Sequence, residues 1–288
     1  MVAWSEGSIQ ANDLNIHSYR NGGTGKPQLL VLHGVMDNGL CWTPVARDLQ
    51  ARFDVIMPDA QGHGRTRGSL EHFSYPQLAD DVAALIGALS LEKPSLFGHS
   101  MGAMTSVVVA ASDPDLVRAI VLEDPPFMDE SPLKSEGNVP AAENLQAFQN
   151  ILSLKTMSPQ ERLVAARNYN PTRDEAELGP WADSKIEFDP GILQHLQVMF
   201  PWREMLPAST CPILLVTGDP AAGAIVTPQV AQEVSSLWQR GEVIGDPGSR
   251  ALHLSRSLCR DHATNPGLSE SGMSHVLKEE VPSQAQPL

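Results

Sequence analysis

Basic residues are scarce in this chain of 288 residues, which carries 20 Lys and Arg against 34 Asp and Glu and therefore has a formal net charge of −14. A protein that binds the phosphate backbone of a nucleic acid needs a basic surface that displaces counterions. The acidic balance therefore argues against a nucleic-acid partner. It does not name a substrate, because net charge mainly governs solubility.

Cysteine is also scarce, since only Cys41, Cys211 and Cys259 are present, far apart and without a C-x-x-C pair. Neither a disulfide framework nor a zinc site is expected, which favours a reducing, cytoplasmic location. The opening residues, MVAWSEGSIQ, lack the charged and apolar regions of a signal peptide. No apolar run approaches the length that crosses a bilayer, so we expect an acidic globular protein without a membrane span.

Short apolar runs bounded by turn residues are present, and stretches of helical periodicity lie between them. The runs occupy 28–32, 53–57, 94–97, 119–122 and 212–216, with a weaker sixth at 242–244. Apolar residues at helical spacing occupy 75–91, 103–111 and 227–238. Strands that alternate with helices predict an α/β fold with a mostly parallel central sheet and helices on both faces.

One segment, at about 127–206, interrupts this alternation because it holds helical patterns and no strand-like run. Within it, 158–161 (SPQE) forms a capping box with proline at the first helical position. We expect a helical lid inserted between two strands, with ordinary packing helices as the alternative. The length suits a single domain over 1–288 that includes this lid and an irregular C-terminal segment at about 249–288.

The sequence Gly98-His99-Ser100-Met101-Gly102 follows an expected strand and precedes an expected helix. In this setting G-x-S-x-G is typical of a nucleophile elbow, where two glycines allow a sharp turn that exposes the serine hydroxyl. The helix that follows directs its first N–H groups toward developing negative charge. The motif therefore indicates Ser100 as a nucleophile.

From about 29 to 238 the chain resembles the serine hydrolases of the α/β-hydrolase fold. Besides the elbow, 32–35 (LHGV) resembles the H-G-x oxyanion loop of that family, and 58–66 resembles its D-x-x-G-x-G-x-S turn, with Thr66 in place of Ser. The resemblance implies the α/β-hydrolase fold and a Ser-His-Asp triad. It also implies an oxyanion hole made by the backbone N–H groups of Val35 and Met101.

Two residues are candidates for the acid that orients the catalytic histidine. Asp219 follows the run at 212–216, where members of the family usually have this acid. Asp124 follows the run at 119–122, where some relatives have it instead. We favour Asp219 and keep Asp124 as the alternative.

The histidine is harder to assign, because none follows Pro247-Gly248 at the spacing that the family uses. If 249–272 is an insertion, its removal joins Gly248 to 273–275 (MSH) and gives P-G-M-S-H, which resembles the histidine loop of the family. The separation of Asp219 and His275 then falls from 56 to 32 residues. We therefore favour His275 as the base, with His253 second.

The reaction that these residues predict is hydrolysis of a small, apolar carboxylic ester or lactone through an acyl-enzyme, without a metal or an organic cofactor. Ser100 attacks, His275 acts as base and then as acid, and Asp219 orients it. The same triad serves C–C bond hydrolases, thioesterases and amidases, so these reactions stay open. A non-catalytic binding protein of the same fold is the alternative from another class, because the altered histidine loop would leave Ser100 without a base. Oligomeric state is not readable from the sequence.

Overall fold

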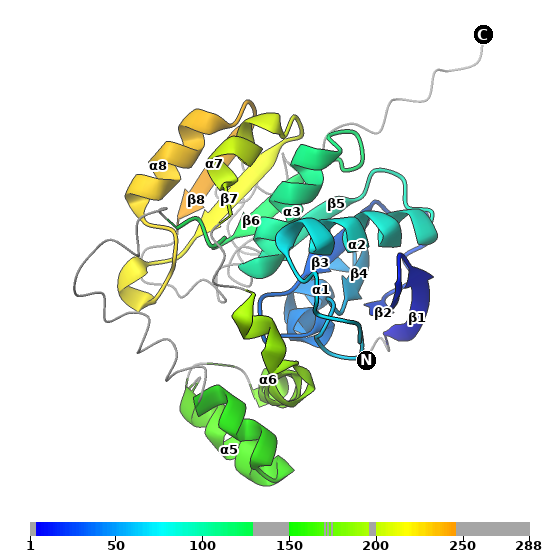
Figure 1. Cartoon of the computed structure of the whole chain (residues 1–288), viewed down its shortest axis with the longest axis vertical. Helices are drawn as coiled ribbons and strands as arrows, with labels where there is room; N and C mark the ends of the chain where they lie inside the picture. Colours follow the sequence, from blue (N-terminus) through cyan, green and yellow to red (C-terminus); the bar gives the residue numbers. More distant parts are fainter. Residues whose placement is uncertain are drawn as a thin grey trace.

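The computed structural model of the protein describes residues 4–128, 150–169, 171, 173, 175–195 and 200–245. In this part of the chain, eight strands form one sheet in the order β1-β2-β4-β3-β5-β6-β7-β8. Strand β2 pairs antiparallel with β1 and β4, and every other pairing is parallel. The expected mostly parallel sheet is confirmed (Figure 1).

The strands are short, as buried parallel strands usually are. They are β1 (Ser5–Ala11), β2 (Leu14–Arg20), β3 (Gln28–Leu32), β4 (Asp54–Pro58), β5 (Ser95–His99), β6 (Ile120–Glu123), β7 (Ile213–Thr217) and β8 (Gly241–Gly245). The α-helices are α1 (Thr43–Leu49), α2 (Tyr75–Ala88), α3 (Met101–Ser112), α5 (Pro159–Tyr169), α6 (Glu175–Glu187), α7 (Trp202–Met205) and α8 (Pro228–Leu237).

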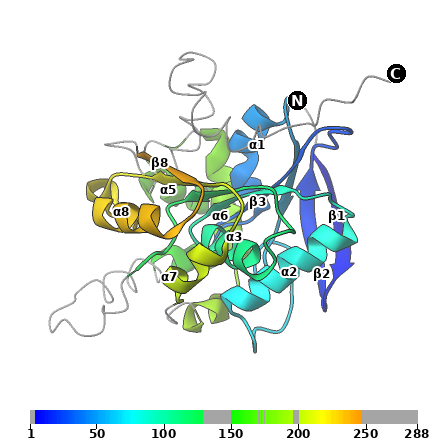
Figure 2. The same ribbon diagram turned by 90° about the horizontal axis from the view of Figure 1, so that it is seen from above.

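Helices cover both faces of the sheet, which explains why its central strands are apolar throughout. Alternate residues of a strand point to opposite faces. Leu30 and Leu32 of β3 join a core cluster with residues of α2 and α3, whereas Leu29 and Val31 join a second cluster with residues of α1. Figure 2 shows α1 on one side of the sheet and α2 and α3 on the other.

The six apolar runs of the sequence correspond to β3–β8, each shifted by two residues or fewer. The hairpin of β1 and β2 was not predicted, because exposed polar residues dominate β1 and leave little alternation to detect. Asn12, between the two strands, has a φ of 53°, a left-handed conformation that asparagine tolerates well in a tight turn.

Residues 150–195, called the helical segment below, lie at one end of the sheet, and α5 extends furthest from it (Figure 1). The capping box is confirmed: the N–H of Ser158 donates to the Glu161 carboxylate at 2.8 Å, and the N–H of Glu161 donates to the Ser158 hydroxyl at 3.4 Å. The segment has its own apolar core, made of Leu154, Ala166, Leu178, Trp181 and Ala182. Of the expected lid at about 127–206, residues 129–149, 170, 172, 174 and 196–199 fall outside the described residues.

Candidate active site

Ser100 lies between β5 and α3 in a strained backbone conformation. Its φ and ψ are 49° and −111°, in a region that residues with a side chain rarely adopt. Close packing of the two glycines of the motif holds this turn. A Cβ on Gly98 would lie 2.3 Å from the Gly102 backbone, and a Cβ on Gly102 would lie 2.2 Å from the Leu32 carbonyl oxygen. The turn therefore requires both glycines, and Ser100 remains partly exposed at the edge of the sheet.

The loop after β3 approaches this serine closely, since a Cβ on Gly34 would lie 3.5 Å from the Cβ of Ser100. The His33 ring fixes the loop. Its Nε2 accepts the N–H of Ala60 at 3.0 Å, so its proton is on Nδ1, which donates to the Gly34 carbonyl at 2.8 Å. Burial lowers the pKa of His33 and so favours the neutral ring that this arrangement needs.

The Gly34–Val35 peptide is thereby oriented. Its carbonyl also accepts the N–H of Asp37 at 3.2 Å, and in a trans peptide the N–H points away from the carbonyl. The N–H of Val35 is therefore directed to the side opposite His33. Met101 is the first residue of α3, where backbone N–H groups have no partner within the helix. The loop and the helix start are thus the two elements that supply the predicted oxyanion donors.

The turn at 59–66, which follows β4, is hydrogen-bonded to the end of the loop after β3. The carboxylate of Asp59 accepts the N–H of Gly39 and the N–H of Arg65, each at 2.8 Å. Gly64 has a φ of 49°, and a Cβ on it would lie 2.2 Å from the Asp59 carboxylate. This packing explains why the turn needs glycine beside the aspartate.

Asp124 lies directly after β6, next to the elbow. His99 and Glu123 are register partners of β5 and β6, so Ser100 and Asp124 follow at the same edge of adjacent strands, and the N–H of Ser100 donates to the Glu123 carbonyl at 2.9 Å. Asp124 is 3% exposed and has a φ of 44°. Its Oδ1 accepts the N–H groups of Ile225 and Val226, both at 2.9 Å, and its Oδ2 shares the N–H of Ile225 at 3.0 Å. Burial raises the pKa of this carboxyl, and the two backbone donors partly offset the rise.

Asp219 lies after β7, two strands away from β5, and is half-buried. Its Oδ1 accepts the N–H of Ala221 at 2.8 Å and so caps the short helical turn at Pro220–Ala222. The structure therefore brings Asp124, rather than Asp219, to the strand adjacent to that of Ser100. His275 and His253, the candidates for the base, lie outside the described residues.

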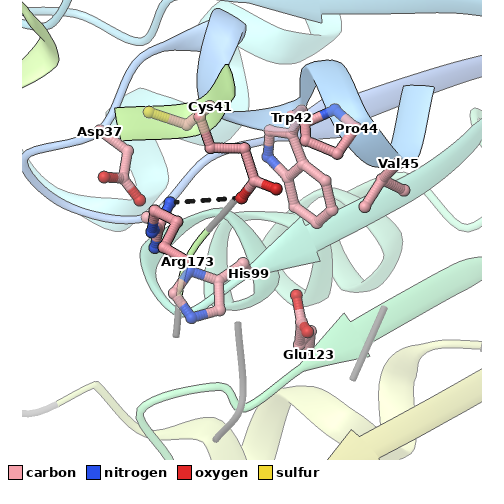
Figure 3. Close-up of a pocket in the computed structure, with 10 residues that line it drawn as sticks. Asp37, Cys41, Trp42, Pro44, Val45, His99, Glu123 and Arg173 are labelled. Carbon is pink, nitrogen blue, oxygen red and sulfur yellow. Dashed lines mark ion pairs between the residues drawn. The ribbon is translucent and has the colours of Figure 1, made fainter. Parts of the chain in front are cut away.

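A pocket with both charged and apolar side chains adjoins the elbow on the side of α1. The residues that line it come from the loop after β3, the start of α1, the ends of β5 and β6, and the helical segment: Gly34, Asp37, Cys41, Trp42, Pro44, Val45, His99, Glu123, Arg173 and Glu177. Figure 3 shows Arg173 close to His99, and the dashed line marks its ion pair with Glu177, 3.8 Å apart. Burial lowers the pKa of His99 to about 4, so its ring is neutral at pH 7. Sequence reasoning missed Arg173 and Asp37, which belong to no recognisable motif.

An apolar cluster includes Met101 and has Val35 packed against it. Met36 and Met101 pack there against Phe188 and Ile192 of the helical segment, with Val35 partly buried against them. Among the described residues, no group of three or more histidine, cysteine or acidic side chains is arranged to hold a metal ion. In the same part of the chain, no helix is both long and apolar enough to cross a membrane.

Comparison with known proteins gives consistent matches. Residues 27–249 match the model of a family described as alpha/beta hydrolase fold. The 2-(acetamidomethylene)succinate hydrolase of Mesorhizobium japonicum is 29% identical over 241 residues, which cover 80% of this chain and 83% of that protein. Lipase LipV of Mycobacterium tuberculosis is 29% identical over 212 residues, 69% of this chain and 70% of the lipase. The crystal structure of the N-formylmaleamic acid deformylase from Pseudomonas putida S16 superposes with a TM-score of 0.73 at 21% identity, covering 91% of this chain and 100% of that one.

Proposed function

Because the chain belongs to the alpha/beta hydrolase fold family, we propose that it is a serine hydrolase that cleaves a carboxylic ester or lactone through an acyl-enzyme. The observation that carries this proposal is the conformation of Ser100. A φ of 49° is costly for serine, and close-packed glycines on both sides maintain it. Strain of this kind at a partly exposed serine, beside the backbone N–H groups of Val35 and Met101, supports a nucleophile rather than a simple turn.

The reaction proceeds in two halves. The Oγ of Ser100 forms a bond to the substrate carbonyl carbon while its proton passes to the histidine base. The tetrahedral oxyanion is stabilised by the N–H groups of Val35 and Met101. The bond to the leaving oxygen then breaks, and that oxygen takes the proton from the imidazolium. Water repeats the sequence on the acyl-enzyme and releases the acid and Ser100.

For the acid we propose Asp124, in place of the Asp219 that the sequence favoured. Asp124 follows the strand adjacent to β5, is buried, and binds two backbone N–H groups through Oδ1, one of which Oδ2 shares. A carboxylate oxygen can accept two hydrogen bonds, so Oδ2 still has capacity for an imidazole N–H. Asp219 is more exposed and caps a local turn. His275 stays our proposal for the base, with His253 as the alternative.

The apolar cluster of Met36, Met101, Phe188 and Ile192 supports a small apolar group on the substrate, with the helical segment acting as a lid. We also propose a cytoplasmic location, from the scarcity of cysteine. A second candidate reaction is hydrolysis of a C–N bond. It is favoured by the relative named 2-(acetamidomethylene)succinate hydrolase, which matches over most of both chains, and the same nucleophile and oxyanion hole serve both reactions.

A fluorophosphonate probe tests whether Ser100 is an activated nucleophile. We expect the wild-type protein to be labelled and the Ser100→Ala variant not to be. Absence of labelling in folded wild-type protein would instead support a non-catalytic binding protein. Hydrolysis of p-nitrophenyl esters of increasing chain length, of lactones and of N-acyl amides then separates the candidate reactions, because a C–N hydrolase would turn over the amides at least as well as the esters.

A further inference from the structure

Helix α6 of the helical segment inserts a lysine under the oxyanion loop. Lys185 is 3% exposed, and its ammonium donates to the Met36 carbonyl at 2.9 Å and to the Asp37 carboxylate. The Trp181 ring, one turn earlier on α6, lies with its centroid 4.8 Å from Nζ. All three N–H groups of the ammonium can therefore interact favourably, two with oxygen acceptors and one with an aromatic face.

The contact joins two backbone peptides in series. Lys185 binds the carbonyl of the Met36–Asp37 peptide, and the N–H of that same peptide donates to the Gly34 carbonyl at 3.2 Å. The Gly34 carbonyl belongs to the peptide whose N–H is the proposed oxyanion donor at Val35. A continuous line of aligned dipoles thus runs from the ammonium to the oxyanion position.

Two physical effects follow from this line. The first is positioning, because Met36 has a φ of 66°, which a residue with a side chain adopts only when its surroundings hold it there. The second is polarisation, since each hydrogen bond in such a chain strengthens the next by roughly 10–30%. A buried cation at the start of the chain makes the last N–H a better donor to negative charge.

Stability alone does not explain why the Lys185–Asp37 ion pair is buried. Burial removes the hydration of both charges, and apolar residues can often replace such a pair without loss of stability. Burial would raise the pKa of Asp37, but the adjacent Lys185 ammonium outweighs it and holds that pKa below its usual value. Asp37 thus remains an anion that secures Lys185 beneath the loop. A second contact also joins α6 to this loop: the Asn38 amide, next to Asp37, donates to the Glu187 carboxylate at 2.8 Å.

We propose that Lys185 is a positioning residue of the oxyanion hole, which orients and polarises the N–H of Val35 through the Met36–Asp37 and Gly34–Val35 peptides. The inference rests on the proposed function, since it assigns the helical segment a part in transition-state stabilisation in that same site. It predicts that loss of the ammonium affects the tetrahedral state and leaves ground-state binding unchanged.

The test compares Asp37→Asn with the double variant Asp37→Asn/Lys185→Met. The two proteins differ at residue 185 alone. In Asp37→Asn the ammonium keeps the Met36 carbonyl and can bind the amide oxygen of the asparagine, and the double variant leaves no buried, unpaired charge that would prevent folding. Lys155→Met is the matched control. Lys155 lies in the same helical segment and donates to the carbonyls of Ile186 and Phe188 at the end of α6, not to the oxyanion loop.

The readouts are kcat and KM for the best p-nitrophenyl ester, and the inhibition constants of an alkyl trifluoromethyl ketone and of the matching methyl ketone. The first ketone forms a tetrahedral adduct with an activated serine, and the second reports ground-state binding. We expect the double variant to lose about tenfold in kcat and in trifluoromethyl ketone affinity relative to Asp37→Asn. This is less than the loss of 10²–10³ that is usual when an oxyanion donor itself is removed. KM, methyl ketone affinity and the Lys155→Met variant should change less than twofold.

The outcomes are distinct. Equal kcat and equal trifluoromethyl ketone affinity in the two folded proteins would overturn the inference while leaving the proposed function intact. Equal losses for both ketones, or equal losses in Lys155→Met, would show a general structural role and would also overturn it. A folded wild-type protein that neither hydrolyses esters nor binds the trifluoromethyl ketone more tightly than the methyl ketone would overturn the proposed function, and the inference with it.

Discussion

Replacement of Asp124 by asparagine should abolish most activity while leaving the fold intact. Asparagine tolerates the φ of 44° at this position better than most residues. Oδ1 of the aspartate accepts both backbone donors, from Ile225 and Val226, so the amide oxygen of asparagine can keep both bonds, and only the shared contact of the Ile225 N–H with Oδ2 is lost. The amide NH₂ then replaces Oδ2. It cannot accept an N–H from the catalytic imidazole, so the wrong tautomer of the histidine faces Ser100.

The magnitude follows from these contacts. Loss of the orienting carboxylate typically lowers kcat by about 10⁴, or about 5.5 kcal/mol of transition-state stabilisation. The free energy of unfolding should change by about 1 kcal/mol or less, because the two backbone hydrogen bonds survive. Asp124→Ala, which removes both charge-assisted acceptors, should lose on the order of 3 kcal/mol of stability as well.

Asp219→Asn is the matched comparison. Its amide oxygen can still cap the turn through the N–H of Ala221, so the free energy of unfolding should stay close to that of wild type. The value of kcat should remain within a few-fold of wild type. Steady-state hydrolysis of a p-nitrophenyl ester and urea denaturation of each variant provide the measurements. A folded Asp124→Asn protein with nearly wild-type kcat, together with an inactive Asp219→Asn protein, would refute the geometric reasoning and return the role to Asp219.

Three further predictions concern the elbow, His99 and the base. Gly102→Ala should cost about 3 kcal/mol or more in urea denaturation, because its Cβ would lie 2.2 Å from a backbone oxygen of β3, whereas Gly87→Ala, with open space around it in α2, should gain about 0.5–1 kcal/mol. Similar stabilities for the two variants would contradict the packing described. Between pH 6.5 and about 4 the unfolded chain binds more protons than the folded chain at His99, so stability should fall by on the order of 3 kcal/mol as the pH drops through this window. His99→Gln should make that dependence less steep, with the remainder due to His33 and His63, whose pKa values burial also lowers, and an unchanged slope would count against it. His275→Ala should abolish fluorophosphonate labelling and His253→Ala should leave most of it, and the reverse result would reject an insertion at 249–272.

Local sequence patterns were sufficient for most of the sheet. Five continuous apolar runs predicted β3–β7, because each of these strands is buried on both faces and needs apolar residues throughout, and the weaker sixth predicted β8, an exposed edge strand. The elbow was equally legible, since only glycine fits where a Cβ would contact backbone at 2.2–2.3 Å. The N-terminal hairpin was not predicted, because pairing with β2, rather than the composition of its own residues, makes β1 a strand.

The sequence by itself therefore determined the fold class, the strained turn at Ser100 and the two loops that flank it, because short-range packing and backbone strain dictate particular residues at those positions. It could not choose between Asp124 and Asp219, since both follow a strand and only the strand order brings β6 next to β5. It gave no sign of the contact between Asp37 and Lys185, which are 148 residues apart. Burial and charge pairing between distant segments exist only once the chain has folded, and on them depend the choice of acid and the link from the helical segment to the oxyanion loop.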